Sequence, residues 1–314
     1  MTARVDQPAG QSSPFSDQRL IAMIIQIVSI VFPVFAVILV GFVYGRRHRP
    51  DMIATNQVNM DVFVPALIFS ALAGQSFSLA DVQMIAIGGV VIVLGPGLLG
   101  LPIAHKLGYQ AKTLLPPMMF KNAGNMGLPL LLLAFGHEAL PAAVILFLIE
   151  NVLHFTISSL WLGNNVKVWR LLREPVFIAG AAGIAVSLTG VTLWQPVLAA
   201  FKVIGDVATG LMLFALGVRL TTAPLGEWRI GMVGALATPA SGLLLAALFC
   251  WGFDLSSRET DVLILFGALP PAVLNYMFAE RYAQEPEKVA AIVILGNLFA
   301  LVSISLALAF RLAG

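Results

Sequence analysis

Two amide-bearing stretches stand out in an otherwise apolar chain. In the first, Lys121 is followed by Asn122 and Asn125 in a run that reads Lys-Asn-Ala-Gly-Asn-Met-Gly-Leu-Pro and ends at Pro129. Asparagine amides can donate hydrogen bonds to a carboxylate, and a buried ammonium raises the local positive potential. We therefore interpret these residues as candidates for binding an organic anion. Two alternatives stay open: the asparagines could satisfy backbone groups, and the Lys121 side chain could extend to the membrane surface.

The same run carries residues that shape the backbone. Gly124 and Gly127 would let a ligand or a second helix approach the main chain closely. Pro129 suits the first turn of a resumed helix, where its missing N–H costs nothing. We include all three in the candidate site, with helix packing as the equal alternative for the two glycines.

The second stretch reads Pro-Pro-Ala-Val-Leu-Asn-Tyr and begins at Pro270. Pro271, Asn275 and Tyr276 are its candidate site residues, because an amide and a phenol can together orient a polar head group. For Tyr276 the alternative is a packed aromatic ring with a satisfied hydroxyl.

Glu150, Asn151 and His154 form a third group. Glu150 and His154 are four residues apart and therefore share one face of a helix. A carboxyl beside an imidazole could carry a proton, and this group is our candidate for proton coupling. A structural pair that fixes the helix register is the alternative.

The elements that position these residues are predicted to cross a membrane. The chain is 59% hydrophobic and 11% charged, against about 25% charged residues in soluble domains. We place ten spans of a length that suits a bilayer of about 30 Å. The expected spans are 22–45, 55–74, 83–104, 113–135, 138–162, 175–193, 197–219, 230–252, 260–280 and 288–312.

Loop charges predict the orientation. If Arg46 and Arg47 lie in the cytoplasm, most of the other Lys and Arg residues in loops fall on the same side, as the positive-inside rule requires. Ten spans then place both termini outside, in a multi-pass protein of the cell (inner) membrane.

The two halves of the chain resemble each other weakly. Asp61 and Val62 correspond to Asp206 and Val207, and the Pro-Pro stretches of the two halves each precede an asparagine. Because each half has five spans, the halves would insert with inverted topology. The predicted organisation is a mobile tail, an inverted repeat, a short cytoplasmic linker and a second inverted repeat. Their ranges are 1–19, 20–163, 164–174 and 175–314.

Two further pairs have simpler interpretations. Asp61 and Asp206 are predicted to open the second and seventh spans as helix caps, or else to line a vestibule. Gly41 and Gly45, four residues apart, indicate close packing of the first span against another helix. A homodimer through this face is the alternative.

These motifs resemble the auxin efflux carrier family, which includes bacterial malonate-type carriers. The resemblance rests on the run from Asn122 to Pro129, on the stretch from Pro270 to Tyr276, and on Pro65-Ala-Leu-Ile-Phe and Leu213-Phe-Ala-Leu-Gly. It implies an all-α fold of ten transmembrane helices in two inverted five-helix repeats, with broken helices 4 and 9 crossing at mid-membrane. The bile acid–sodium symporters are similar in this plan, but no acidic residue lies beside the ninth-span break, which disfavours sodium coupling.

The sequence therefore predicts a secondary transporter of a small organic anion, with protons as the favoured coupling ion. A sodium symporter, a channel and a receptor without transport remain the alternatives. We expect no cofactor, no metal and no nucleic-acid partner. The residues after His137-Glu138 lack the second histidine of a zinc protease, and no phosphate-binding or nucleophile motif occurs, so an enzyme is not expected.

Overall fold

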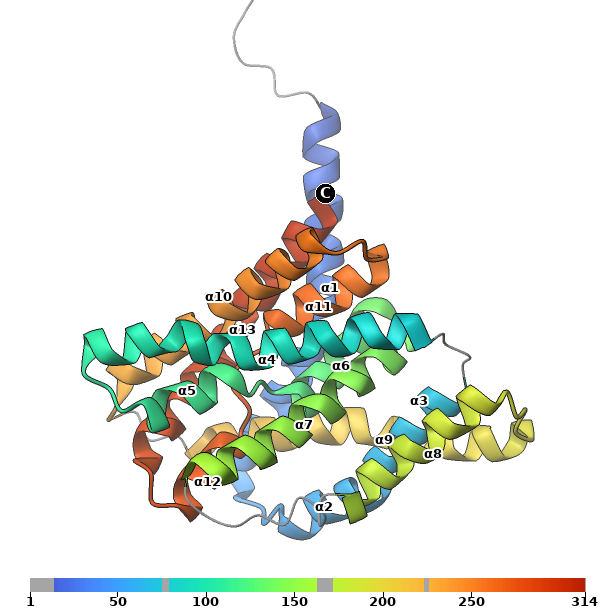
Figure 1. The fold of residues 1–314 in the computed structure, drawn as a ribbon, viewed down its shortest axis with the longest axis horizontal. Helices are drawn as coiled ribbons and strands as arrows, with labels where there is room; N and C mark the ends of the chain where they lie inside the picture. Colours follow the sequence, from blue (N-terminus) through green and yellow to red (C-terminus); the bar gives the residue numbers. More distant parts are fainter. Residues whose placement is uncertain (1–13, 75–78, 163–171, 223–225, 314) are drawn as a thin grey trace, which may run out of the picture.

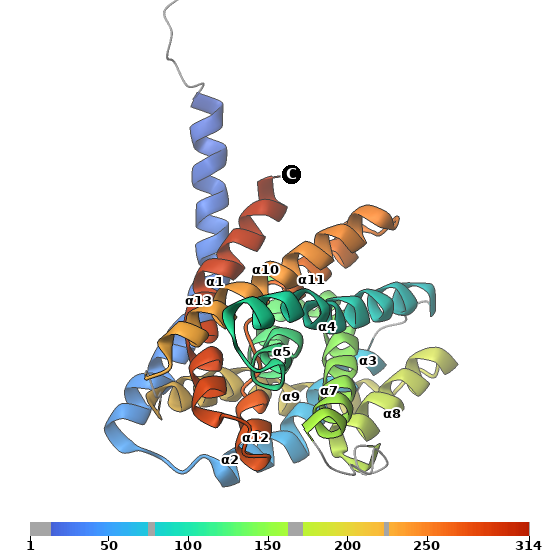
Figure 2. The ribbon, with the colours of Figure 1, turned by 60° about the vertical axis from the view of Figure 1, so that its left-hand side comes forward.

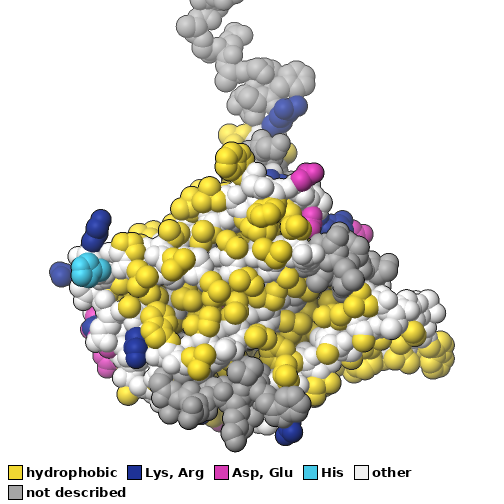
Figure 3. All heavy atoms as spheres, in the orientation of Figure 1, with side chains coloured by type: hydrophobic (Ala, Val, Ile, Leu, Met, Phe, Trp, Pro, Cys, Tyr) yellow, Lys and Arg dark blue, Asp and Glu magenta, His cyan; other side chains and the backbone are white. Residues whose placement is uncertain are grey.

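The computed structural model describes residues 14–74, 79–162, 172–222 and 226–313. Within these ranges the chain is helical, and its only β pairing is an isolated bridge. The expected tail at 1–19 and linker at 164–174 therefore lie largely outside the described residues. Hydrophobic side chains cover most of the face shown in Figure 3, and Lys, Arg and His side chains gather at its left-hand edge.

One group of helices, which we call the panel group, contains the first, second, sixth and seventh expected spans. Its long helices pack on one another, α1 against α9 and α3 against both α8 and α9. The elements of this group are α1 (Pro14–His48), α2 (Ile53–Val58), the π-helical turn η1 (Asn59–Phe63), α3 (Val64–Ala73), α8 (Pro175–Thr189), α9 (Gln195–Arg219) and the 3-10 turn η5 (Leu220–Thr222).

The remaining elements form a second group, which we call the crossing group. In it α10 packs against α13, α4, α11 and α5, and α4 also packs against α7. The elements of this group are α4 (Leu79–Leu107), α5 (Ala111–Met119), the π-helical turn η2 (Ala123–Gly127), α6 (Leu128–Phe135), the 3-10 turn η3 (His137–Ala139), α7 (Leu140–Leu162), α10 (Trp228–Gly252), α11 (Ser257–Gly267), α12 (Leu274–Arg281) and α13 (Pro286–Ala313).

Among the described residues, six helices are long and apolar enough to cross a membrane. They include α1, α4, α7, α9, α10 and α13, whereas the other four expected spans correspond to shorter helices or to pairs of them. The start of α1 and the end of α13 lie on the same side of the molecule in both Figure 1 and Figure 2. The protein is therefore an all-helical, multi-pass membrane protein.

The two groups meet along a few elements. α1 contacts α13 and α6, α3 contacts α7, and α9 contacts both η2 and α6. The η2 turn thus belongs to the crossing group but lies against the panel group. This position matters because η2 contains the first amide-bearing stretch.

Small residues bring α1 and α9 together. A Cβ added to Gly41 would lie 2.2 Å from the carbonyl oxygen of Phe214, and one added to Gly217 would lie 2.0 Å from that of Ile38. Only glycine allows such an approach. The predicted close packing of the first span is therefore confirmed, and its partner is α9.

The predicted capping role of Asp61 and Asp206 is wrong. The helical segment that contains Asp61 begins at Ile53, and α9 begins at Gln195, so both aspartates lie well inside helical segments. Both side chains are exposed. Several helical residues precede each aspartate, so neither side chain can cap the first turn of its helix.

Candidate functional site

Two non-helical stretches, one after α5 and one before α12, satisfy each other's backbone groups. An isolated antiparallel bridge joins them. The N–H of Asn122 donates to the carbonyl oxygen of Pro270 at 2.7 Å, and the N–H of Ala272 donates to that of Phe120 at 2.9 Å. Backbone groups without helical partners must find others in an apolar interior. The pairing therefore fixes these two distant stretches against each other.

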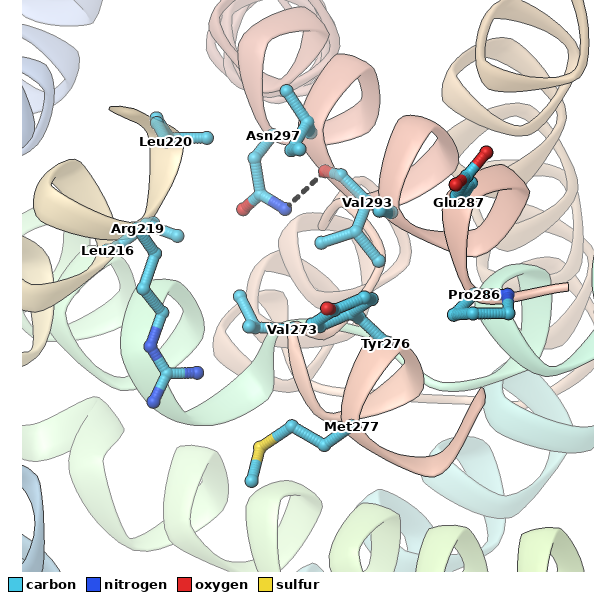
Figure 4. A pocket seen from close by; sticks show the side chains of 12 residues that line it. Leu216, Arg219, Leu220, Val273, Tyr276, Met277, Pro286, Glu287, Val293 and Asn297 are labelled. Carbon is cyan, nitrogen blue, oxygen red and sulfur yellow. Dashed lines mark hydrogen bonds between the residues drawn. The ribbon is translucent and has the colours of Figure 1, made fainter. Parts of the chain in front are cut away.

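Asparagine side chains extend this junction into α13. The Asn122 amide nitrogen donates to Asn297 Oδ1 at 2.9 Å. In turn, Asn297 Nδ2 donates to the carbonyl oxygens of Pro271 and Val293 at 3.0 and 2.7 Å, the second of which is drawn in Figure 4. Asn122 and Asn297 are both buried. We call these two residues the amide pair.

Asn275 performs a similar task on the other side of the junction. Its Nδ2 donates to the carbonyl oxygens of Phe120 and Ala272, both at 2.9 Å. Its Oδ1 is buried and has no hydrogen-bond partner among the described residues. Asn275 thus satisfies backbone groups, and it does not border the cavities described below.

A cavity of about 340 Å³, which we call the amide cavity, lies between the panel and crossing groups. Panel residues such as Asn59 and Met212 border it on one side. Seven of the sequence-predicted residues border it from the crossing group. These are Lys121, Asn122, Gly124, Asn125, Glu150, Asn151 and His154.

Glu150 and His154 are buried together at the edge of this cavity. Glu150 Oε1 lies 3.4 Å from His154 Nδ1, and the imidazole stacks on the Phe120 ring with 4.1 Å between centroids. Within the described structure neither ring nitrogen of His154 has a hydrogen-bond partner. Asn151 donates to the carbonyl oxygen of Phe147 in its own helix. The predicted shared face of Glu150 and His154 is confirmed.

The Lys121 side chain is fully buried and faces α10. Its ammonium donates to the carbonyl oxygen of Thr238 at 3.3 Å, and a Cβ added to Gly242 would lie 2.5 Å from Nζ. Neither α10 residue borders the amide cavity. Lys121 therefore lies in the wall of the cavity, while its hydrogen bond joins the stretch after α5 to α10.

Two of the predicted backbone-shaping residues, Gly124 and Gly127, pack closely against neighbouring side chains. A Cβ on Gly124 would lie 2.9 Å from the Phe147 ring, and one on Gly127 would lie 2.8 Å from Leu269. Pro129 occupies the first turn of α6, as predicted. Gly127 and Pro129 do not border the amide cavity, whereas Gly124 does.

A larger cavity of about 710 Å³, the α13 cavity, lies between the end of α9, α12 and α13. Figure 4 shows Tyr276 and Val273 facing this space from the α12 side and Asn297 from α13. Tyr276 donates to Glu280 at 3.0 Å and does not border the amide cavity. Val273 and Met277 border both cavities, so the two spaces adjoin.

Sequence reasoning missed two residues of this site. The first is Asn297, in the expected span 288–312, where an amide in an apolar segment is itself a signal. The second is Arg219, at the end of the expected span 197–219. In the structure it is half-buried in the last turn of α9 and borders both the amide cavity and the α13 cavity.

Comparison with known proteins finds similarity to membrane transporters. A family model described as "Membrane transport protein" matches residues 156–308. A protein of Rhizobium meliloti (strain 1021) named "Putative malonate transporter" is 23% identical over 308 residues, which cover 89% of this chain and 94% of that protein.

The chain is thus similar to membrane transport proteins and not to enzymes in these comparisons. Both similarities support the resemblance to the auxin efflux carrier family that the sequence motifs indicated.

Proposed function

We propose that this chain is a secondary transporter that carries a small organic anion, such as a carboxylate, across the cell membrane by alternating access. The observation that carries the proposal is the amide cavity, which lies between two helix groups and beside a junction of two non-helical stretches. Irregular backbone is tolerated at membrane depth where it is buried in protein or lines a cavity, and such sites bind substrate in many transporters.

In this proposal the amides of Asn122 and Asn125 bind the carboxylate. Gly124 lets it approach the backbone, and Lys121 raises the local potential from the cavity wall. Asn275 and Pro271 hold the junction, Gly127 and Pro129 hold η2 and α6, and Tyr276 borders the adjoining α13 cavity.

The architecture we propose is two inverted five-helix repeats of ten transmembrane helices, with both termini outside. The position of the α1 start and the α13 end on one side of the molecule supports an even number of crossings. Movement of the panel group relative to the crossing group would then expose the amide cavity to each side in turn.

Coupling to protons is the part of the proposal that rests on Glu150 and His154, with Asn151 beside them. A buried carboxyl next to an imidazole can take up a proton from a cavity and release it when the cavity changes sides. The absence of an acidic residue between Ala272 and Asn275 disfavours sodium.

Flux of radiolabelled malonate into vesicles that contain the purified protein tests the proposal. We expect saturable uptake, loss of uptake in Asn122→Ala, and acceleration by an imposed pH gradient that Glu150→Gln removes. Undiminished uptake in a folded Asn122→Ala protein would refute the assigned site. Unsaturable currents in planar bilayers would instead indicate a channel.

A further inference from the structure

The structure contains a third cavity, of about 600 Å³, at the end of α1 and α9. Its described wall contains three guanidinium-bearing side chains, those of Arg46, Arg49 and Arg219, and no acidic residue among the described residues. We call it the arginine cavity. Guanidinium groups bind carboxylates and phosphates through paired charge-assisted hydrogen bonds.

Arg219 connects this cavity to the two others. It is the one described residue that borders the arginine cavity, the amide cavity and the α13 cavity. Figure 4 shows its guanidinium extending from the end of α9 toward Met277 on α12. An anion bound at Arg219 would therefore be adjacent to the space beside the amide pair.

The sequence and packing fix the positions of these arginines. α1 ends at His48, and the N–H of Arg49 donates to the carbonyl oxygen of Gly45 at 3.0 Å. A Cβ added to Gly45 would lie 3.1 Å from the Cα of Val218, the residue before Arg219. The close contact of α1 and α9 thus brings Arg46, Arg49 and Arg219 to one cavity.

We propose that Arg46, Arg49 and Arg219 form an anion-binding vestibule through which the carboxylate reaches the amide cavity. Arg46 and Arg49 attract and hold the anion at the surface, because a cleft with charge of one sign concentrates the oppositely charged ligand. Arg219 then binds the carboxylate on its way into the interior. The route rests on the proposed transport function, whereas anion binding at the arginines does not.

Arg47 offers a matched control for charge. It lies between the vestibule arginines on the last turn of α1 and is exposed, but it borders none of the three cavities. General attraction of anions to a basic membrane surface would involve Arg47 as much as Arg46. Binding in a specific vestibule would depend on Arg46 and not on Arg47.

Two measurements test the proposal with malonate as the probe. The first is calorimetric binding to the purified protein, and the second is uptake by vesicles of neutral lipid with and without anionic phosphatidylglycerol. For Arg219→Gln we expect Kd and KM to rise about 10-fold or more, because a charge-assisted pair is lost. Arg219→Lys should recover part of the affinity.

For the double variant Arg46→Gln/Arg49→Gln we expect KM to rise about 3-fold or more, with a weaker dependence on salt and an unchanged maximal rate. Arg47→Gln should behave as the wild type. The uncharged analogue malonamide should not bind.

The possible failures are distinguishable. An unchanged malonate Kd in Arg219→Gln, or equal effects of the Arg46→Gln/Arg49→Gln and Arg47→Gln changes, would overturn the vestibule. Effects confined to vesicles with phosphatidylglycerol would assign the arginines to a lipid head group and also overturn it. Malonate binding that depends on Arg219 without any uptake would support the anion site and refute the transport function.

Discussion

At the residue scale, the amide pair performs two tasks with one set of atoms. Asn297 accepts a hydrogen bond from Asn122 and donates to the carbonyl oxygens of Pro271 and Val293. It therefore satisfies the carbonyl group of Pro271 in the non-helical stretch before α12, and it also orients the Asn122 amide at the edge of the cavity. The structural and binding interpretations of these asparagines are compatible.

Replacement of Asn297 tests the structural task. Asn297→Ala leaves the buried groups of Asn122 and Pro271 without partners, so we expect unfolding in detergent to require about 1–3 kcal/mol less free energy. Ser305→Ala is the control on the same helix, because Ser305 is partly buried and its hydroxyl donates to the carbonyl oxygen of Leu301 within α13. Equal stability of the two variants would mean that the amide pair is not structurally important.

Residue types predicted part of this site. A polar or charged side chain in an apolar span is a candidate site residue by its type alone. Four such residues border the amide cavity: Asn122, Asn125, Glu150 and His154. The direction of a side chain cannot be predicted in this way. Lys121 extends toward Thr238, more than a hundred residues away, and only tertiary packing determines that contact.

At the element scale, close contacts between helices set the positions of the functional residues. α9 contributes Arg219, and its approach to α1 depends on Gly41 and Gly217. At the other end of the site, the turn before α13 is tied to α5, where Thr113 donates to Glu285 at 2.5 Å and Gln284 donates to Gln110 at 2.8 Å. The junction of the two non-helical stretches is thus held by contacts on both of its flanks.

Two glycines of α9 provide a matched pair of substitutions. A Cβ on Gly217 would overlap the carbonyl of Ile38, whereas one on Gly210 would meet nothing within 4 Å. We expect Gly217→Ala to destabilise the protein in detergent and to raise KM for malonate, because α1 and α9 must move apart near Arg219. Gly210→Ala should keep or increase stability by about 0.5–1 kcal/mol, since alanine favours helices. A Gly217→Ala protein as stable as Gly210→Ala would contradict this packing.

Apolar length and composition predicted the long helices well. α1, α4, α7, α9, α10 and α13 each correspond to an expected span. The starts of the second and seventh expected spans, 55 and 197, also lie within two residues of the observed starts at Ile53 and Gln195. The capping role of Asp61 and Asp206 was therefore wrong although the span starts were right, because both residues already lay inside these spans.

At the scale of the whole molecule, the important feature is that the amide cavity lies between the panel group and the crossing group. The amide cavity is bordered by η1 and α9 of one group and by η2 and α7 of the other. When two helix groups move relative to each other, the openings of a cavity between them change. The openings of a cavity inside one group do not change in this way. Repeat counterparts in the sequence indicated two related halves, but each group takes helices from both halves. This intermixing could not be seen from the weak repeat.

Accessibility of Val273 tests alternating access at the cavity most directly. Val273 borders both the amide and α13 cavities. In a Cys250→Ser background, which removes the single native cysteine, we expect Val273→Cys to react with a membrane-impermeant maleimide from either side of oriented vesicles. Malonate should slow both reactions, and the exposed Leu298→Cys on α13 serves as a control that malonate does not affect. Reaction from one side only, at a rate that malonate leaves unchanged, would contradict a transport site between the two helix groups.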